Sequence, residues 1–390
     1  MKMKKNLLSL AVLFAATAMF TACDKEDNIF DGKPHTYTVE FSDNVFVVNS
    51  GNMYNGISGS LTSYSPLTAS NVQDAFSKVN GRSLGATPNS GVVYGSKLYV
   101  VVDGENRIEV LDANTLKAGT PISTITLLGE DEGKSPRHIL ALDGKIYVTT
   151  YGGVVAAIDT TNYQLAKKYT VGSYPEGLAY ADGKIYVANS SYGNGVAPSI
   201  SIITLASGQV DTFTDEGIKN PSTVLAVNGA VYVMEGDLYN STDWSLVSQG
   251  GLRRIKDNTV ENLYFSSMAM GANQMAVYKD KIYMIKDAYT APKCVVWDTT
   301  TDLIEEIELE GLVAANAINV DPYIGEIYVL SYSKNAEVTE YTAADYNAPG
   351  FCNRYSNDGK LIKSFATGVG PTAVIFKKGE MEVTINPDEN

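Results

Sequence analysis

The clearest chemistry near the start of the chain is that of a single cysteine. Thr21-Ala22-Cys23 follows an apolar run from Leu7 to Phe20, which is itself preceded by three lysines. This run is too short for a good membrane span and has the flanks of a secretory signal. Small residues before a cysteine predict lipoprotein processing, with residues 1–22 removed and Cys23 acylated, so that lipid alone would hold the protein to a bilayer. The alternative is ordinary signal cleavage, with Cys23 an incidental thiol.

Residues suited to catalysis are scarce in the rest of the chain. The sequence has no nucleophile elbow, no histidine-rich metal cluster and no glycine motif that would cradle a phosphate. His138, in Pro136-Arg137-His138, could donate to a ligand or coordinate a metal ion held within one. The alternative is a histidine satisfied between neighbouring repeats. We therefore expect a binding protein without catalytic residues, and with neither a metal nor a cofactor of its own.

The charge balance excludes one class of partner. The full chain carries 30 basic and 44 acidic residues, for a net charge of −14. Removing residues 1–22 removes three lysines and no acids, so the mature chain carries 27 basic and 44 acidic residues, a net charge of −17. Such a surface repels phosphate backbones, and we expect no nucleic-acid binding.

One short pattern recurs seven times and predicts the fold. Its core is an apolar strand, usually Ile/Leu/Val-Tyr-Val, and successive copies are 39 to 53 residues apart, the period of a four-stranded propeller blade. The copies begin at Val45, Leu98, Ile146, Ile185, Val231, Ile282 and Ile327. The tyrosines within the pattern, such as Tyr99 and Tyr328, are expected to be structural.

Other strands and turns complete each repeat. A first strand precedes each copy after the initial one, and the first strands begin at Pro88, Pro136, Pro175, Pro221, Asn273, Asn316 and Pro371. Asp143-Gly144, Asp182-Gly183 and Asn228-Gly229 predict type I′ hairpins between first and second strands. Third strands are expected at segments such as 107–112 and 294–298, and fourth strands at segments such as 122–127 and 304–309.

The strand count predicts how the fold closes. The strand near Val45 has no first strand before it, and the strand from Pro371 to Lys377 has no second strand after it. Pairing the two would complete a seven-bladed, all-β propeller of four-stranded blades and remove two exposed sheet edges. The expected organisation is a signal peptide at 1–22, a lipidated cysteine and acidic tether at 23–43, a propeller at 44–378 and a tail at 379–390.

Length variation points to one face of this propeller as the binding surface. The loops from second to third strands share a face with the loops between blades, and several are long and rich in Tyr, Asn, Ser and Gly. The candidate ligand contacts, chosen by loop position together with His138, are Asn52, Tyr54, His138, Tyr151, Tyr192, Asn194, Tyr239, Trp244, Tyr289, Tyr332 and Tyr341. Alternatively, some of these rings only pack their own loops.

The repeated Gly-Lys-Ile-Tyr-Val strands and Pro175-Glu176-Gly177 resemble those of YncE-like, surface-layer-type YVTN propellers. Asp24-Lys25-Glu26-Asp27 resembles the acidic signal that sends lipoproteins to the outer face of the outer membrane in certain gut Gram-negative bacteria, although any polar tether would look similar. Together these features resemble BtuG-type surface lipoproteins. The resemblance implies capture of cobalamin (vitamin B12) or related corrinoids and delivery to a TonB-dependent outer-membrane transporter, over which the propeller sits as a lid.

Two other functions stay open at this point. Exposed aromatic rings also stack on sugars, so a glycan- or host-protein-binding surface propeller is the first alternative. The second is a propeller lyase or hydrolase that uses loop acids for proton transfer. Cys294 and Cys352 are expected to be free, buried thiols, since they fall on neighbouring repeats beyond disulfide reach.

Overall fold

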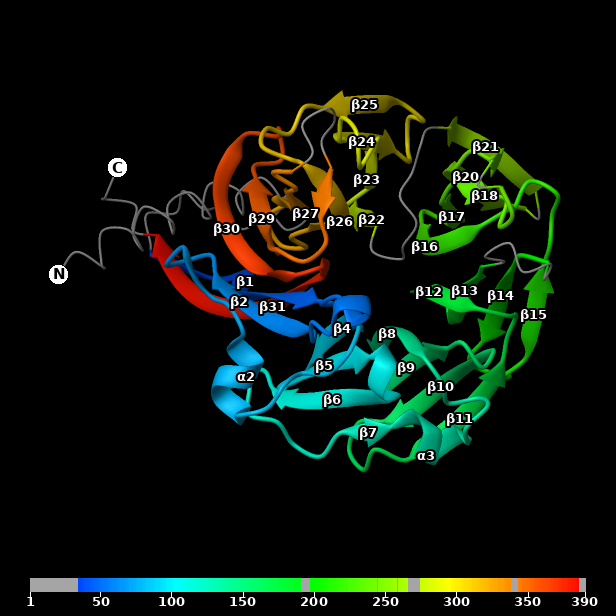
Figure 1. Ribbon diagram of the computed structural model, residues 1–390, viewed down its shortest axis with the longest axis horizontal. Coiled ribbons are helices and arrows are strands. Elements are labelled where there is room, and N and C mark those ends of the chain that lie inside the picture. Colours follow the sequence, from blue (N-terminus) through cyan, green and yellow to red (C-terminus); the bar gives the residue numbers. More distant parts are fainter. Residues whose placement is uncertain are drawn as a thin grey trace.

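The computed structural model describes residues 34–190, 197–243, 245–257, 259–265, 274–337 and 343–385. Within them the chain is almost entirely β-strand, which confirms the all-β class. These residues form seven antiparallel sheets of four or five strands, which follow one another around a common centre (Figure 1). A separate hairpin pairs β18 (Leu238–Tyr239) with β19 (Leu246–Ser248).

Each of the seven sheets has one strand nearest the centre, here called the inner strand. From the inner strand outward, the first four sheets are β31 (Pro371–Ile385), β1 (His35–Asn49), β2 (Ser60–Ser65), β3 (Ser70–Val72); β4 (Pro88–Tyr94), β5 (Lys97–Val102), β6 (Arg107–Asp112), β7 (Ile122–Ser123); β8 (Pro136–Leu142), β9 (Lys145–Thr150), β10 (Val154–Asp159), β11 (Leu165–Thr170); and β12 (Pro175–Ala181), β13 (Lys184–Asn189), β14 (Ser199–Thr204), β15 (Val210–Phe213). The other three are β16 (Pro221–Val227), β17 (Ala230–Glu235), β20 (Gly251–Lys256), β21 (Thr259–Phe265); β22 (Met275–Tyr278), β23 (Lys281–Lys286), β24 (Lys293–Asp298), β25 (Ile304–Ile307); and β26 (Ala314–Val320), β27 (Ile327–Lys334), β29 (Pro349–Tyr355), β30 (Leu361–Val369), with β28 (Ala344–Asp345) also paired to β27.

The hairpins between inner and second strands follow from local chemistry. Asp143 and Gly144 have φ values of 48° and 73°, and the Asp182-Gly183 and Asn228-Gly229 pairs match them closely. Two successive positive φ values are what a type I′ turn requires, and Asp, Asn and Gly accept them at low cost. The predicted hairpins are therefore confirmed.

The outermost strand of one sheet differs from the prediction. Residues 122–127 were expected as a strand, but only Ile122 and Ser123 are extended, and α3 (Thr124–Leu128) follows at once. The Ser123 hydroxyl caps this helix by accepting the Thr126 N–H at 3.2 Å, while the Thr124 hydroxyl donates to the carbonyl of Gly133 at 2.6 Å. A capped helical turn therefore replaces the expected strand pairing, although the residues of this segment favour β-strands. The other helical segments are η1 (Met53–Asn55), α2 (Ala75–Asn80) and η2 (Asp103–Glu105).

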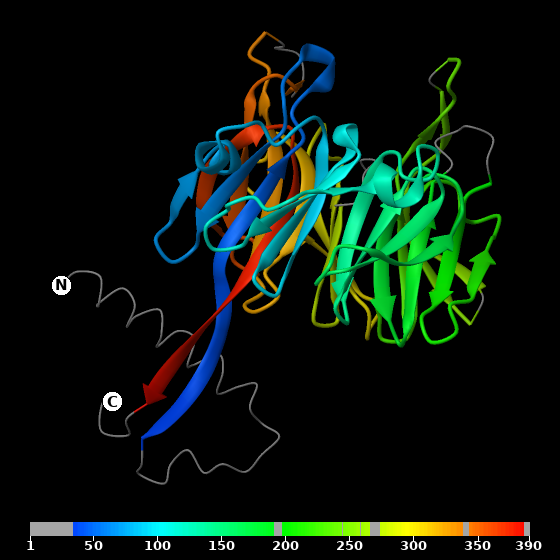
Figure 2. The same ribbon diagram turned by 90° about the horizontal axis from the view of Figure 1, so that it is seen from below.

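The first and last described strands lie side by side. β1 and β31 pair antiparallel from His35↔Ile385 to Asn49↔Pro371, so residues from opposite ends of the chain share the N–C sheet, which consists of β31, β1, β2 and β3. Both strands run past the expected boundaries at 44 and 378. Residues 35–42 and 378–385 form a two-stranded ribbon that leaves the body opposite the loops carrying η1 and the β18–β19 hairpin (Figure 2).

The hydrophobic core lies between neighbouring sheets. Phe46 and Ile375 of the N–C sheet pack with Leu98 of β5, while Val45 and Val374, from the same sheet, pack with Tyr328 of β27. The N–C sheet therefore buries apolar side chains against both of its neighbours. Cys294 and Cys352 are buried free thiols, as expected.

Candidate ligand-binding site

The inner strands begin with a shared irregularity that aims side chains toward the centre. Six of the seven have a β-bulge directly after their first paired residue or residues, and the bulges contain Asn89, Arg137 and His138, Glu176 and Gly177, Ser222, Asn316, and Thr372. A bulge leaves a residue out of the ladder and re-aims its side chain. Polar side chains from several sheets are thereby directed to the end of the central axis where the inner strands start.

The residues just before these strands adopt uncommon backbone conformations. Thr87, Ser135 and Tyr174 each precede a proline and have φ values of 48°, 48° and 52°. A positive φ is rare for residues other than glycine, and a following proline restricts the backbone further. Such strain clusters at functional sites.

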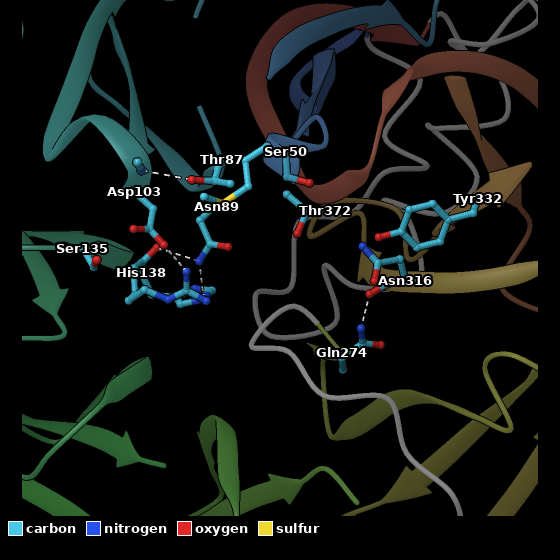
Figure 3. A pocket seen from close by; sticks show the side chains of 13 residues that line it. Ser50, Thr87, Asn89, Asp103, Ser135, His138, Gln274, Asn316, Tyr332 and Thr372 are labelled. Atoms are coloured by element: carbon cyan, nitrogen blue, oxygen red, sulfur yellow. Dashed lines mark hydrogen bonds and ion pairs between the residues drawn. The ribbon is translucent and has the colours of Figure 1, made fainter. Parts of the chain in front are cut away.

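A polar cavity of about 600 Å³ lies where these segments meet (Figure 3). We call it the well. Its lining residues come from at least five of the sheets and the loops beside them, and they are Ser50, Met53, Thr87, Asn89, Asp103, Gly104, Ser135, Arg137, His138, Gln274, Asn316, Tyr332 and Thr372. Figure 3 shows Asn89 and His138 facing Asn316 and Tyr332 across the space. Most of these side chains are neutral hydrogen-bonding groups.

Hydrogen bonds between sheets hold part of this wall. The Asn89 side-chain amide donates to the carbonyl of Arg137 at 3.1 Å. On the far side, the Gln274 amide donates to the carbonyl of Asn316, whose own side chain donates to the carbonyl of Pro371 at 2.8 Å. Each bond joins the start of one inner strand to the next sheet, so the wall is preorganised.

One side of the well rests on a largely buried charge network. Arg137 donates from Nε to Glu176 Oε2 at 3.0 Å and from Nη2 to Oε1 at 3.2 Å, and its Nη1 pairs with Asp103. The Tyr151 hydroxyl donates to the same Glu176 carboxylate, and its ring lies 4.7 Å from the Arg137 guanidinium carbon. Bidentate pairs of this kind fix geometry as well as charge.

Burial and this network set the protonation states. Burial is the main cause that lowers the pKa of His138 to about 4, so the imidazole is neutral at pH 7. Burial alone would raise the pKa of Glu176, but Arg137, together with His138 and the Tyr151 hydroxyl, holds the pKa below its ordinary value. The network therefore carries one cation and two carboxylates, those of Asp103 and Glu176.

An apolar recess of about 420 Å³ adjoins the well, and we call it the shelf. Its lining residues are Gly51, Asn52, Met53, Tyr54, Thr87, Tyr332 and Tyr346, of which Met53, Thr87 and Tyr332 also line the well. The rings of Tyr332 and Tyr346 meet edge to face, with centroids 4.9 Å apart. Burial raises the pKa of Tyr332 to about 12, so its hydroxyl stays protonated.

The structure brings together some of the predicted contacts. His138 and Tyr332 line the well, and Asn52, Tyr54 and Tyr332 line the shelf. Tyr289 lies beside Tyr332 and Tyr346 but lines neither space. Asn52 also has a structural role, because its side chain donates to the carbonyl of Tyr346 at 3.2 Å and joins two loops.

The other predicted contacts fall elsewhere. Tyr151 packs beneath Arg137, and Tyr239 donates its hydroxyl to Asp237 at 3.3 Å on the β18–β19 hairpin; neither lines the well or the shelf. Cys23, Tyr192, Asn194, Trp244 and Tyr341 lie outside the described residues.

Several lining residues were not expected from the sequence, among them Asn89, Gln274, Asn316 and Met53. Asn89 follows the proline that begins its inner strand, and Gln274 follows Asn273, where the corresponding first strand was expected to begin. A polar residue at the second position of the first strand was therefore the available signal in the sequence.

The described residues contain neither a membrane-spanning helix nor a cluster of metal ligands. No helix among them is both long and apolar enough to cross a bilayer. Nor do three or more His, Cys, Asp or Glu side chains gather there in a way that could hold a metal ion.

Comparisons with solved structures support a β-propeller. The chain is similar to hydrazine synthase of Kuenenia stuttgartiensis, with a TM-score of 0.54 and 15% identity, over 78% of this chain and 96% of that one. It is also similar to the WD40 domain of Neurospora crassa Pan2, with a TM-score of 0.52 and 10% identity, over 78% and 90%. WD40 domains are β-propellers, and this likeness concerns the fold alone. No functionally curated protein matches the sequence. Residues 43–368 match the model of the family described as Domain of unknown function (DUF5074), and the chain therefore belongs to that family.

Proposed function

We propose that this protein is a surface-anchored, non-enzymatic binding propeller of the YncE-like, BtuG type. It captures cobalamin or a related corrinoid and passes it to a TonB-dependent outer-membrane transporter. In this proposal the seven sheets are seven blades of one closed ring. The pairing of β1 with β31, and the packing of the N–C sheet on both neighbours, support that closure.

The observation that carries the proposal is the joining of a polar well to an aromatic shelf. A corrinoid combines a broad macrocycle with a rim of amide arms. Tyr332 and Met53 border both spaces, so one ligand could lay a ring against the shelf while its arms enter the well. Together the two spaces have the size usual for small-molecule sites.

The ribbon supports the proposed anchoring. Lipidation at Cys23, with residues 24–27 as an acidic export signal, would tether the chain from its N-terminal side. The ribbon carries the start of β1 away from the side of the body where the loop with η1 lies (Figure 2). An anchor attached there leaves the binding face unobstructed.

The charge network argues against proton-transfer chemistry at the well. A general acid working near neutral pH needs a raised pKa. The Glu176 pKa is instead lowered, and both Glu176 and Asp103 bond to Arg137. These carboxylates are better suited to orienting Arg137 than to catalysis.

One observation favours a second candidate, a glycan-binding surface propeller. Tyr54 is 92% exposed, and Tyr346 beside it is half-exposed. Exposed rings of this kind can stack on sugars as well as on a macrocycle.

Isothermal titration of the purified protein with cyanocobalamin tests the proposal. We expect saturable one-to-one binding, and a protein purified with bound corrinoid should be pink. A glycan array run in parallel separates the second candidate. Binding to a glycan, with no heat from micromolar cyanocobalamin, would replace the corrinoid assignment.

A further inference from the structure

We infer that the well selects electrically neutral ligand arms bearing N–H donors, primary amides above all, and rejects arms that end in a carboxylate. This inference rests on the proposed function and goes beyond it, because it states which chemical state of a corrinoid the site accepts.

The wall of the well contains a buried acceptor that lacks a donor, the side-chain oxygen of Gln274. Gln274 lines the well and is only 2% exposed. The side-chain nitrogen of Gln274 is the atom that donates to the carbonyl of Asn316. The side-chain oxygen, Oε1, is therefore the atom left to accept a hydrogen bond. Among the described residues, Gln274 Oε1 has no hydrogen-bond partner. Leaving a buried acceptor unpaired costs free energy, and an N–H or O–H from a ligand in the well would remove that cost. A primary amide supplies one, whereas a carboxylate would place a second acceptor there.

The charges beside the well also disfavour a carboxylate. Among the described residues that line the well, Arg137 is the one cation, and its guanidinium is bonded to Asp103 and Glu176. His138 is neutral at pH 7. One cation and two carboxylates give this wall a net charge of about −1, so an incoming carboxylate meets no unpaired cation.

The surroundings reinforce this preference. None of the described residues that line the shelf is charged. The full chain carries a net charge of −14, so the long-range field also opposes anions. Two unit charges interact appreciably across several ångströms of partly buried space, which makes a discrimination of about tenfold reasonable.

Titration with matched corrinoids tests the inference. The neutral parent is cyanocobalamin, and the probes are its three monocarboxylic acids, each with one propionamide hydrolysed to a carboxylate. At pH 7 and low salt we expect all three acids to bind more weakly, and the acid whose altered arm enters the well to lose at least about tenfold.

Two substitutions test whether the well causes this difference in affinity, one by changing a charge and the other by removing an acceptor. Asp103→Asn removes one negative charge but keeps an acceptor for Arg137, so it should strengthen binding of the acids and leave the parent nearly unchanged. Gln274→Met removes the unpartnered acceptor, so it should weaken the parent while changing the acids little. Either variant should reduce the ratio of the parent's affinity to that of the acids by at least about threefold. Glu382→Gln, an exposed neutralisation on the ribbon, is the matched control and should leave the gap intact.

Each outcome has a distinct meaning. If parent and acids all bind within about twofold of one another, the inference is overturned and the corrinoid function stands. If the gap exists but neither Asp103→Asn nor Gln274→Met narrows it, the well does not produce the selectivity and the inference also fails. If neither the parent nor the acids bind, the proposed function and the inference fall together. Circular dichroism of each variant checks that the fold is retained.

Discussion

Arg137 and Glu176 face each other across two neighbouring sheets, joined by two hydrogen bonds of 3.0 and 3.2 Å. Arg137 lies in the bulge of β8 and Glu176 in the bulge of β12. The same Arg137 reaches Asp103 in η2, on the sheet before it. A single side chain therefore ties three successive sheets together at the edge of the well.

Breaking this pair should destabilise the protein. Glu176→Ala removes two hydrogen bonds of Arg137, leaves its pair with Asp103 in place and removes the acceptor of the Tyr151 hydroxyl. Loss of one partner of a buried pair typically costs about 3–5 kcal/mol, but Arg137 is partly exposed and keeps its pair with Asp103, so we expect a loss of about 2–3 kcal/mol. Urea denaturation followed by circular dichroism measures this. Glu380→Ala, which breaks an exposed pair with Lys378 on the ribbon, is the control and should have no measurable effect.

Acidification should weaken the fold through His138. Its pKa of about 4 in the folded state lies below the ordinary value of 6.5, so the unfolded chain binds more protons between these two values. Stability is therefore complete above about pH 6.5 and falls as the pH drops toward 4, by about 3 kcal/mol in total. The lowered pKa of Glu176 adds a further loss below its ordinary value of 4.5.

Thermal melts at intervals between pH 7 and pH 4 measure this dependence. His138→Gln should flatten the slope between pH 6.5 and 5, whatever its effect on absolute stability. His35→Gln replaces the other histidine of the chain and should keep the wild-type slope. A His138→Gln slope equal to that of the wild type would mean that other groups cause the acid sensitivity.

The repeat made most strands predictable, because each hairpin and each Ile/Leu/Val-Tyr-Val strand is a local property of the sequence. The exception at residues 122–127 is also local in origin. Ser123 and Thr124 use their hydroxyls to satisfy backbone groups, and this makes a short helix competitive with a strand.

The site was less predictable than the fold. Loop position identified the side of the molecule on which Tyr54 and Tyr332 lie, but it could not separate them from Tyr151, whose ring packs on Arg137. Asn89 and Asn316 enter the well because a bulge re-aims them, and the alternation of a regular strand gives no sign of that. Thr87 and Ser135 have positive φ values before prolines, which local preferences disfavour.

Removing the ring shared by well and shelf should weaken ligand binding. Tyr332→Ala deletes an aromatic surface that borders both spaces, and we expect a loss of affinity on the order of 2 kcal/mol, about thirtyfold. Tyr332→Phe keeps the ring and should bind within a few-fold of the wild type. Tyr180→Ala removes an exposed tyrosine near the Asp182-Gly183 hairpin, away from both spaces, and should not change affinity. Titration calorimetry with cyanocobalamin compares the three variants.

The pairing of β1 with β31 predicts that two C-terminal deletions will differ sharply. Deleting residues 379–390 removes most of one strand of the ribbon but keeps β31 beside Val45 to Asn49, so the protein should still unfold cooperatively. Val39 and Phe41 are buried in the full chain and should become exposed in this deletion variant. Residues 35–42 should also lose protection from proteolysis and hydrogen exchange.

Deleting residues 371–390 removes the entire inner strand of the N–C sheet. Val374 and Ile375 then no longer pack against the two neighbouring sheets, and the edge of β1 from Val45 to Asn49 loses its partner. If β31 closes the ring as proposed, its loss leaves an unpaired, apolar inner edge, which should abolish cooperative unfolding and promote aggregation. Thermal melts and size-exclusion chromatography compare the two deletions. If the longer deletion melts as cooperatively as the shorter one, β31 does not close the ring, and the central well cannot depend on that closure.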